Sequence, residues 1–113
     1  SIKTLWPEAV EAGKFGVVYA AMRDKNYLGC LGLISKELKP KFYATTVPEM
    51  PRALTPDELL SAASDEEEFE WRAKSVFENP LDAVKKAAGE NENVLICGSL
   101  YLIGWLKRNA DKF

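Results

Sequence analysis

Four short apolar stretches recur along the chain, and each is followed by a segment whose apolar residues are spaced three or four positions apart. Alternation of this kind is typical of βα units, because neighbouring parallel strands need a helical crossover between them. The pattern predicts an α/β, Rossmann-like fold, in which a mostly parallel sheet carries helices on both faces. The strands are predicted near residues 15–22, 42–47, 74–77 and 94–98.

The predicted helices have recognisable ends. Asp24 is expected to cap the helix after the first strand, and Pro40 to stop it. Residues 55–58 combine an N-cap threonine, a first-turn proline and a capping-box glutamate, which is the strongest helix start in the sequence. Further helices are predicted to open at Asn79 and at Ser99. The apolar positions expected in the core are Leu31, Ile34, Leu59, Val84, Ile96 and Leu102.

The size and charge of the chain limit what it can be. Its 113 residues suffice for one hydrophobic core, so residues 1–113 are expected to form a single domain. A net charge of -2 and a pI near 5.2 give no excess of positive charge for a phosphate backbone, so nucleic acid is not an expected partner. No apolar run approaches the ~20 residues that span a bilayer, and the first residues do not look like a signal peptide. A cytoplasmic protein is expected.

The chain has no histidine and only two cysteines, Cys30 and Cys97. Without histidine, the commonest general base and every Ser-His or Cys-His nucleophile are excluded, as is a zinc site of cysteine and histidine. Both cysteines are expected to be buried, reduced thiols. The acidic residues 65–70 are expected to form a solvated surface rather than a metal site, because they lack a coordinating loop pattern.

Ligands of doubly wound sheets bind at the carboxyl ends of the strands, so the residues that follow each strand are the candidates for function. The sequence has no GxxxxGK[ST] phosphate loop to hold ATP phosphates. The candidates after the first, second and fourth strands are Arg23, Asp24, Lys25, Arg52, Ser99 and Tyr101.

Three segments, in this order and at this spacing, form a more specific pattern. Residues 22–27 read MRDKNY, residues 50–59 read MPRALTPDEL, and residues 94–104 read VLICGSLYLIG. Together they resemble the C-terminal domain of folylpolyglutamate synthase/dihydrofolate synthase, of the Mur ligase type, over about residues 15–106. The chain departs from the family at Met50, where asparagine usually precedes the Pro-Arg pair.

The resemblance implies part of an ATP-dependent tetrahydrofolate:L-glutamate ligase. That family joins a folate carboxylate to the amine of glutamate, using ATP and Mg²⁺ through an acyl phosphate. Its phosphate loop lies in a larger N-terminal domain, and a D-G-A-H-N-P segment contacts the nucleotide. This sequence contains neither. The resemblance therefore implies a domain that lacks its first strand, is inactive alone, and meets glutamate, folate and ATP only with the missing N-terminal domain.

The resemblance also assigns roles to the candidates, with no catalytic residue and no metal ligand among them. Arg52 would bind a carboxylate of glutamate, with Ser99, Tyr101 and Lys25 beside it, and Asp24 would contact the nucleotide. Each has a plainer reading. Arg52 could be a solvated loop residue, Ser99 and Asp24 could be helix caps, and Tyr101 could serve packing.

Two further readings of the whole chain stay open. Residues 1–6 read as the end of a helix that Pro7 closes, which implies either a missing upstream strand or a stand-alone N-terminal cap. The chain could be a stand-alone small-ligand-binding or regulatory module. It could also be a structural subunit that docks on a separate ATP-binding chain.

Overall fold

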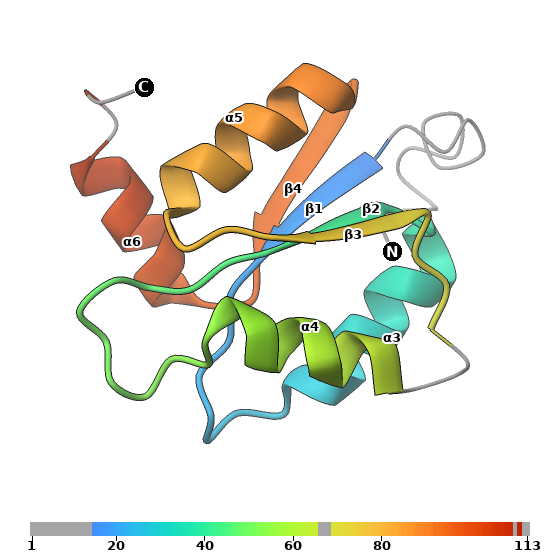
Figure 1. Cartoon of the computed structure of the whole chain (residues 1–113), viewed down its shortest axis with the longest axis horizontal. Coiled ribbons are helices and arrows are strands. Elements are labelled where there is room, and N and C mark those ends of the chain that lie inside the picture. The colour runs from blue at the N-terminus through green and yellow to red at the C-terminus, as the bar shows by residue number, and fades with distance from the viewer. Residues whose placement is uncertain (1–14, 66–68, 110, 112–113) are drawn as a thin grey trace.

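A computed structural model describes residues 15–65, 69–109 and 111, and it has the predicted alternation of strands and helices (Figure 1). The predicted strands are each present, but the first ends at Tyr19 rather than at Met22. The elements are β1 (Phe15–Tyr19), α3 (Tyr27–Leu38), β2 (Lys41–Ala44), α4 (Pro56–Asp65), β3 (Ala73–Val76), α5 (Pro80–Glu90), β4 (Asn93–Cys97) and α6 (Leu100–Arg108).

The strands of the described residues form one parallel sheet in the order β3-β2-β1-β4. Tyr19, at the end of β1, is paired with Ala44 at the end of β2 and with Cys97 at the end of β4. The carboxyl ends of these strands therefore lie at the same edge of the sheet. The chain first moves from β1 to β2 on one side and later returns to β4 on the other side, so the point where the strand order reverses lies between β1 and β4.

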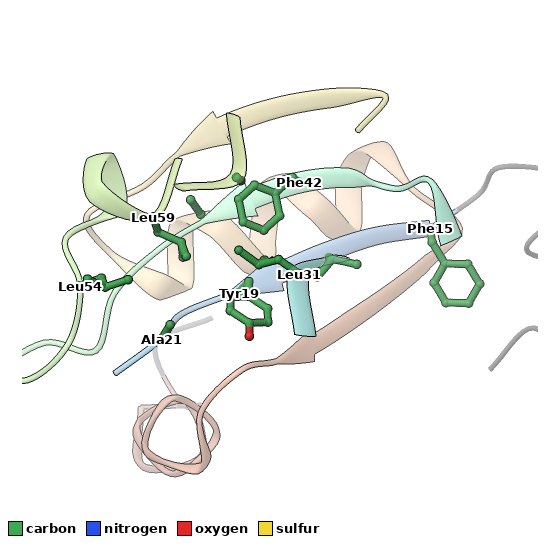
Figure 2. Packing of buried hydrophobic residues seen from close by; sticks show 10 residues of the cluster. Phe15, Tyr19, Ala21, Leu31, Phe42, Leu54 and Leu59 are labelled. Atoms are coloured by element: carbon green, nitrogen blue, oxygen red, sulfur yellow. The ribbon is translucent and has the colours of Figure 1, made fainter. Parts of the chain in front are cut away.

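Helices cover both faces of the sheet, as predicted. α3 and α4 lie on one face, and α5 and α6 lie on the other (Figure 1). On the first face, Tyr19, Phe42, Leu31 and Leu59 belong to one buried cluster, which Figure 2 shows from close by. Because both faces are covered, all five residues of β1 are buried, which explains its continuous apolar sequence.

The predicted core is only partly as expected. Leu31, Leu59 and Leu102 have no exposed surface. Ile34, Val84 and Ile96 are half-buried and pack against the buried clusters from their margins.

The start of α3 differs from the prediction. Asn26 is the N-cap, and its side-chain oxygen accepts a hydrogen bond from the backbone N–H of Gly29 at 3.3 Å. Asp24 was the wrong choice because residues 22–25 form a turn first, closed by a bond from the Lys25 N–H to the Met22 carbonyl at 3.2 Å. Both residue types are good caps, so local preference does not separate them.

The other predicted caps are confirmed. In the capping box, Thr55 N–H donates to Glu58 at 3.0 Å, and Glu58 N–H donates to the Thr55 hydroxyl at 3.1 Å. Asn79 caps α5 through the Leu81 N–H at 2.9 Å.

The prediction that both cysteines are buried was wrong for Cys30. Cys97 is partly buried in β4, but Cys30 is exposed, although it lies on α3 beside the Tyr19 hydroxyl and near Cys97. Of the acidic run, Asp65 and Glu70 are exposed, and residues 66–68 lie outside the described residues. The segment 1–6, with its predicted helix end, also lies outside them.

Two negative findings apply to the described residues. None of their helices has the length and apolar character needed to cross a membrane. Nor do they contain a cluster of three or more histidine, cysteine, aspartate or glutamate side chains that could hold a metal ion.

Candidate functional site at the carboxyl edge

The loops that follow β1 and β2 run side by side at the carboxyl edge. Met22 and Ala53 form an isolated antiparallel bridge. On either side of it, the Arg23 N–H donates to the Arg52 carbonyl at 2.8 Å, and the Leu54 N–H donates to the Ala21 carbonyl at 2.9 Å. These backbone bonds hold the two arginine-bearing loops in a fixed register.

The Arg52 guanidinium brings three of the candidate residues together. Its Nη1 donates to Oδ2 of Asp24 at 3.2 Å, and its Nη2 donates weakly to the Tyr101 hydroxyl at 3.4 Å. The guanidinium carbon is 5.8 Å from the centre of the Tyr101 ring, within the range of a cation–π interaction. About half of the Arg52 and Asp24 side chains is exposed, so a ligand can reach the pair.

A second guanidinium–carboxylate pair lies beside the first. Arg23 donates from Nη1 and Nη2 to the two oxygens of Glu58, at 2.7 and 2.6 Å. This bidentate contact, with the backbone N–H of Thr55, lowers the pKa of Glu58 to about 2, and it raises the pKa of Arg23. Sequence reasoning found Glu58 only as a capping residue. A capping-box glutamate needs only one carboxylate oxygen for the cap. The other oxygen can accept from a second donor, and this was the signal in the sequence for a further partner of Glu58.

Ser99 caps α6, as its plainer reading predicted. The hydroxyl oxygen of Ser99 accepts a hydrogen bond from the Tyr101 N–H at 3.1 Å. The preceding Gly98 has φ of 101°, and a Cβ at this position would lie 2.3 Å from the Ala20 carbonyl oxygen. Only glycine therefore lets the end of β4 pass so close to the end of β1. This close approach holds Ser99 at the point where the strand order reverses.

The remaining candidate, Lys25, is not part of the cluster. Its side chain is exposed and makes no hydrogen bond or ion pair with the described part of the chain. At the start of α6, Leu100 and Tyr101 are exposed large hydrophobic side chains, 86% and 49% accessible. About half of the Tyr101 surface is covered, and its ring and hydroxyl lie against the Arg52 guanidinium.

Two hollows in the described part of the chain do not coincide with these residues. A groove of about 870 Å³ runs along the outer side of α3, and a smaller hollow of about 220 Å³ lies between β2, β3 and α5. Neither is lined by Arg52 or Ser99. The carboxyl edge is the better candidate site, because its polar groups converge and its position is where sheets of this class bind ligands.

The sequence matches no protein-family model and no curated protein. Its structure is similar to Mycobacterium tuberculosis folylpolyglutamate synthase complexed with ADP and AMPPCP, with a TM-score of 0.73 and 20% identity over 95% of this chain and 26% of that one. It is also similar to the bifunctional folylpolyglutamate synthase/dihydrofolate synthase of Yersinia pestis, with a TM-score of 0.72 and 18% identity over 98% of this chain and 24% of that one.

A second structure of the Yersinia enzyme, complexed with AMPPNP and Mn ion, gives a TM-score of 0.70 at 20% identity. In that comparison the match covers 97% of this chain and 25% of the other. The chain thus spans about a quarter of the length of these enzymes. Its α/β, Rossmann-like fold is the fold of one part of a folylpolyglutamate synthase/dihydrofolate synthase.

Proposed function

We propose that the chain is the C-terminal domain of an ATP-dependent ligase that adds glutamate to folate, and that it contributes to binding the amino acid and ATP. One observation carries the proposal. Each of the three segments that resemble the family contributes one residue to a single cluster: Asp24 from the first, Arg52 from the second and Tyr101 from the third. Residues 28 and 49 positions apart in the sequence meet at one guanidinium.

Arg52 is the proposed binder of a glutamate carboxylate. A guanidinium is always charged and presents a forked set of donors that matches a carboxylate. Its present partner, Asp24, shows that a carboxylate oxygen fits at this place. The Tyr101 ring forms one wall of the site, and the Ser99 hydroxyl and the first backbone N–H groups of α6 lie next to it along the chain.

The proposed roles of Lys25 and Asp24 depend on ligands that approach from outside the chain. The Lys25 ammonium is exposed and suited to the glutamate or to the phosphates. Asp24 is proposed as a nucleotide contact, which requires it to release or share Arg52. The described residues include neither a phosphate loop nor a set of Mg²⁺ ligands. Most binding of ATP and Mg²⁺, and the chemical step, therefore belong to the rest of a longer enzyme in this proposal.

Kinetics of the full-length ligase test the site. Arg52→Ala should raise the KM for glutamate roughly tenfold to a hundredfold, because the loss of a charged hydrogen bond costs about 1.5 to 3 kcal/mol. The KM for ATP should change far less. Ser99→Ala should have a smaller effect on glutamate, since a neutral hydroxyl contact contributes only ~0.5 to 1.5 kcal/mol. Lys107→Ala, an exposed residue at the other end of α6, is the control. An unchanged KM for glutamate in a folded Arg52→Ala enzyme contradicts the site.

The activity of the 113-residue chain alone tests whether ATP binding and the chemical step require the rest of the enzyme. Neither ATP hydrolysis nor ligation of glutamate is expected, because the sequence has no phosphate loop. Turnover by the purified chain, with full-length enzyme excluded, would contradict the proposal.

A further inference from the structure

We infer that Arg23 and Glu58 are a positioning pair that fixes Arg52 for its carboxylate ligand. The inference rests on the proposed function, since it takes Arg52 as the binding residue. The Arg23–Glu58 pair is half exposed, and exposed ion pairs contribute little to stability. Yet its geometry is bidentate and short. Because the pair lies between the loops that follow β1 and β2, it can orient Arg52 instead.

The first step is that Glu58 is itself held rigidly. It lies in the first turn of α4, where the capping box fixes it to Thr55 by two hydrogen bonds. The next residue, Leu59, is completely buried and anchors that turn in the core. Glu58 is therefore a fixed point at the carboxyl edge.

The second step is that Arg23 joins this fixed point to Arg52. The side chain of Arg23 binds both oxygens of Glu58, while its backbone N–H binds the Arg52 carbonyl at 2.8 Å. One residue thus holds both ends of the loop 52–58. Burial does not fix the Arg52 side chain, because it is half exposed, and within the described residues its guanidinium bonds only to Asp24 and Tyr101.

The third step is electrostatic. Asp24 and Arg23 are neighbours in the sequence, so a free Arg23 guanidinium would be a second cation close to the Arg52 site. Glu58 neutralises Arg23 and occupies both of its forked donors. Arg52 then remains the guanidinium that can exchange its weaker partner, at 3.2 Å, for an incoming carboxylate.

Kinetics of the full-length ligase test the inference, with Arg23→Met and Glu58→Gln made in the wild-type and in the Arg52→Ala backgrounds. Glutamine can still accept the capping hydrogen bond from Thr55, so Glu58→Gln removes the ion pair with little effect on α4. Each single change should raise the KM for glutamate roughly threefold to thirtyfold, because a binding group is displaced, with a smaller change in the KM for ATP. When Arg52 is already alanine, neither change should raise the KM for glutamate further.

The control is Lys86→Met, which breaks an exposed ion pair with Glu90 on α5 and should leave the KM for glutamate unchanged. Urea unfolding of each variant identifies any that fail to fold. If Arg52→Ala raises the KM but the two positioning variants do not, the inference is wrong and the proposed function stands. The inference is also wrong if Arg23→Met or Glu58→Gln raises the KM for glutamate as much in the Arg52→Ala background as in the wild type, since the pair then acts independently of Arg52. If Arg52→Ala itself has no effect, both fail.

Discussion

Nη1 of Arg52 lies 3.2 Å from Oδ2 of Asp24, so the guanidinium proposed for a substrate carboxylate already has a carboxylate partner from its own chain. Both side chains are about half exposed, at 52% and 53%. In such a solvated setting an ion pair is weak and exchanges readily. The pair therefore keeps Arg52 oriented without preventing a ligand from replacing Asp24.

Replacement of Asp24 tests this competition. In the full-length ligase, Asp24→Asn should lower the KM for glutamate by roughly 1.5- to 5-fold, because an exposed ion pair of about 0.2 to 1 kcal/mol no longer has to be exchanged. The proposed nucleotide role predicts that the KM for ATP rises in the same variant. Asp82→Asn, an exposed change on α5, is the control. A KM for glutamate that rises would show that Asp24 assists the amino acid rather than competing with it.

The pKa of Glu58 predicts a pH dependence. Its value falls from the usual 4.5 to about 2 in the folded chain, chiefly because Arg23 donates to it. The ion pair therefore stabilises the fold fully above about pH 4.5, and its contribution is lost as the pH falls toward 2. The difference in urea midpoint between the wild type and Glu58→Gln should stay constant above pH 5 and shrink below it. By carbon NMR, Arg23→Met should move the Glu58 titration back toward 4.5. If Glu58 of the wild type already titrates with the usual pKa of 4.5, the contact with Arg23 is refuted.

Gly98 should be intolerant of any side chain. Gly98→Ala is expected to destabilise the 113-residue chain by about 2 to 4 kcal/mol, because it combines a strained positive φ with a clash against the Ala20 carbonyl. Gly89→Ala is the matched control, since its added methyl group meets nothing within 4 Å and it lies inside α5. That change should be neutral or stabilising by up to ~1 kcal/mol. Urea unfolding measures both, and equal stabilities would exclude the close approach of β4 to β1.

The two cysteines should differ in reactivity. Burial raises the pKa of the Cys97 thiol to about 12, with a further contribution from Cys30 nearby, whereas Cys30 itself is exposed. With a disulfide reagent at pH 8, one thiol should react at once and the other at least about a hundredfold more slowly, until urea unfolds the chain. Cys30→Ser should remove the fast phase and keep the slow one. Equal rates in the folded wild type would contradict this burial of Cys97.

The sequence alone determined the order of elements, the parallel sheet and most helix starts. These features are local, because periodicity and caps such as Thr55 and Ser99 act within a few residues. The sequence also predicted which edge of the sheet to search, because parallel strands bring all their carboxyl ends to one edge.

The tertiary structure alone decided which candidate side chains meet. Asp24 and Asn26 are equally good caps, and the turn after β1 selected Asn26, which left Asp24 for Arg52. The second role of Glu58 depends on Arg23, 35 residues away, and no local pattern encodes that pairing. The exposure of Cys30 likewise follows from how α3 packs on the sheet, which leaves this thiol open to solvent beside Tyr19 and Cys97. Contacts between distant residues depend on how loops pack on a finished sheet, so their partners appear only once the sheet and its covering helices are in place.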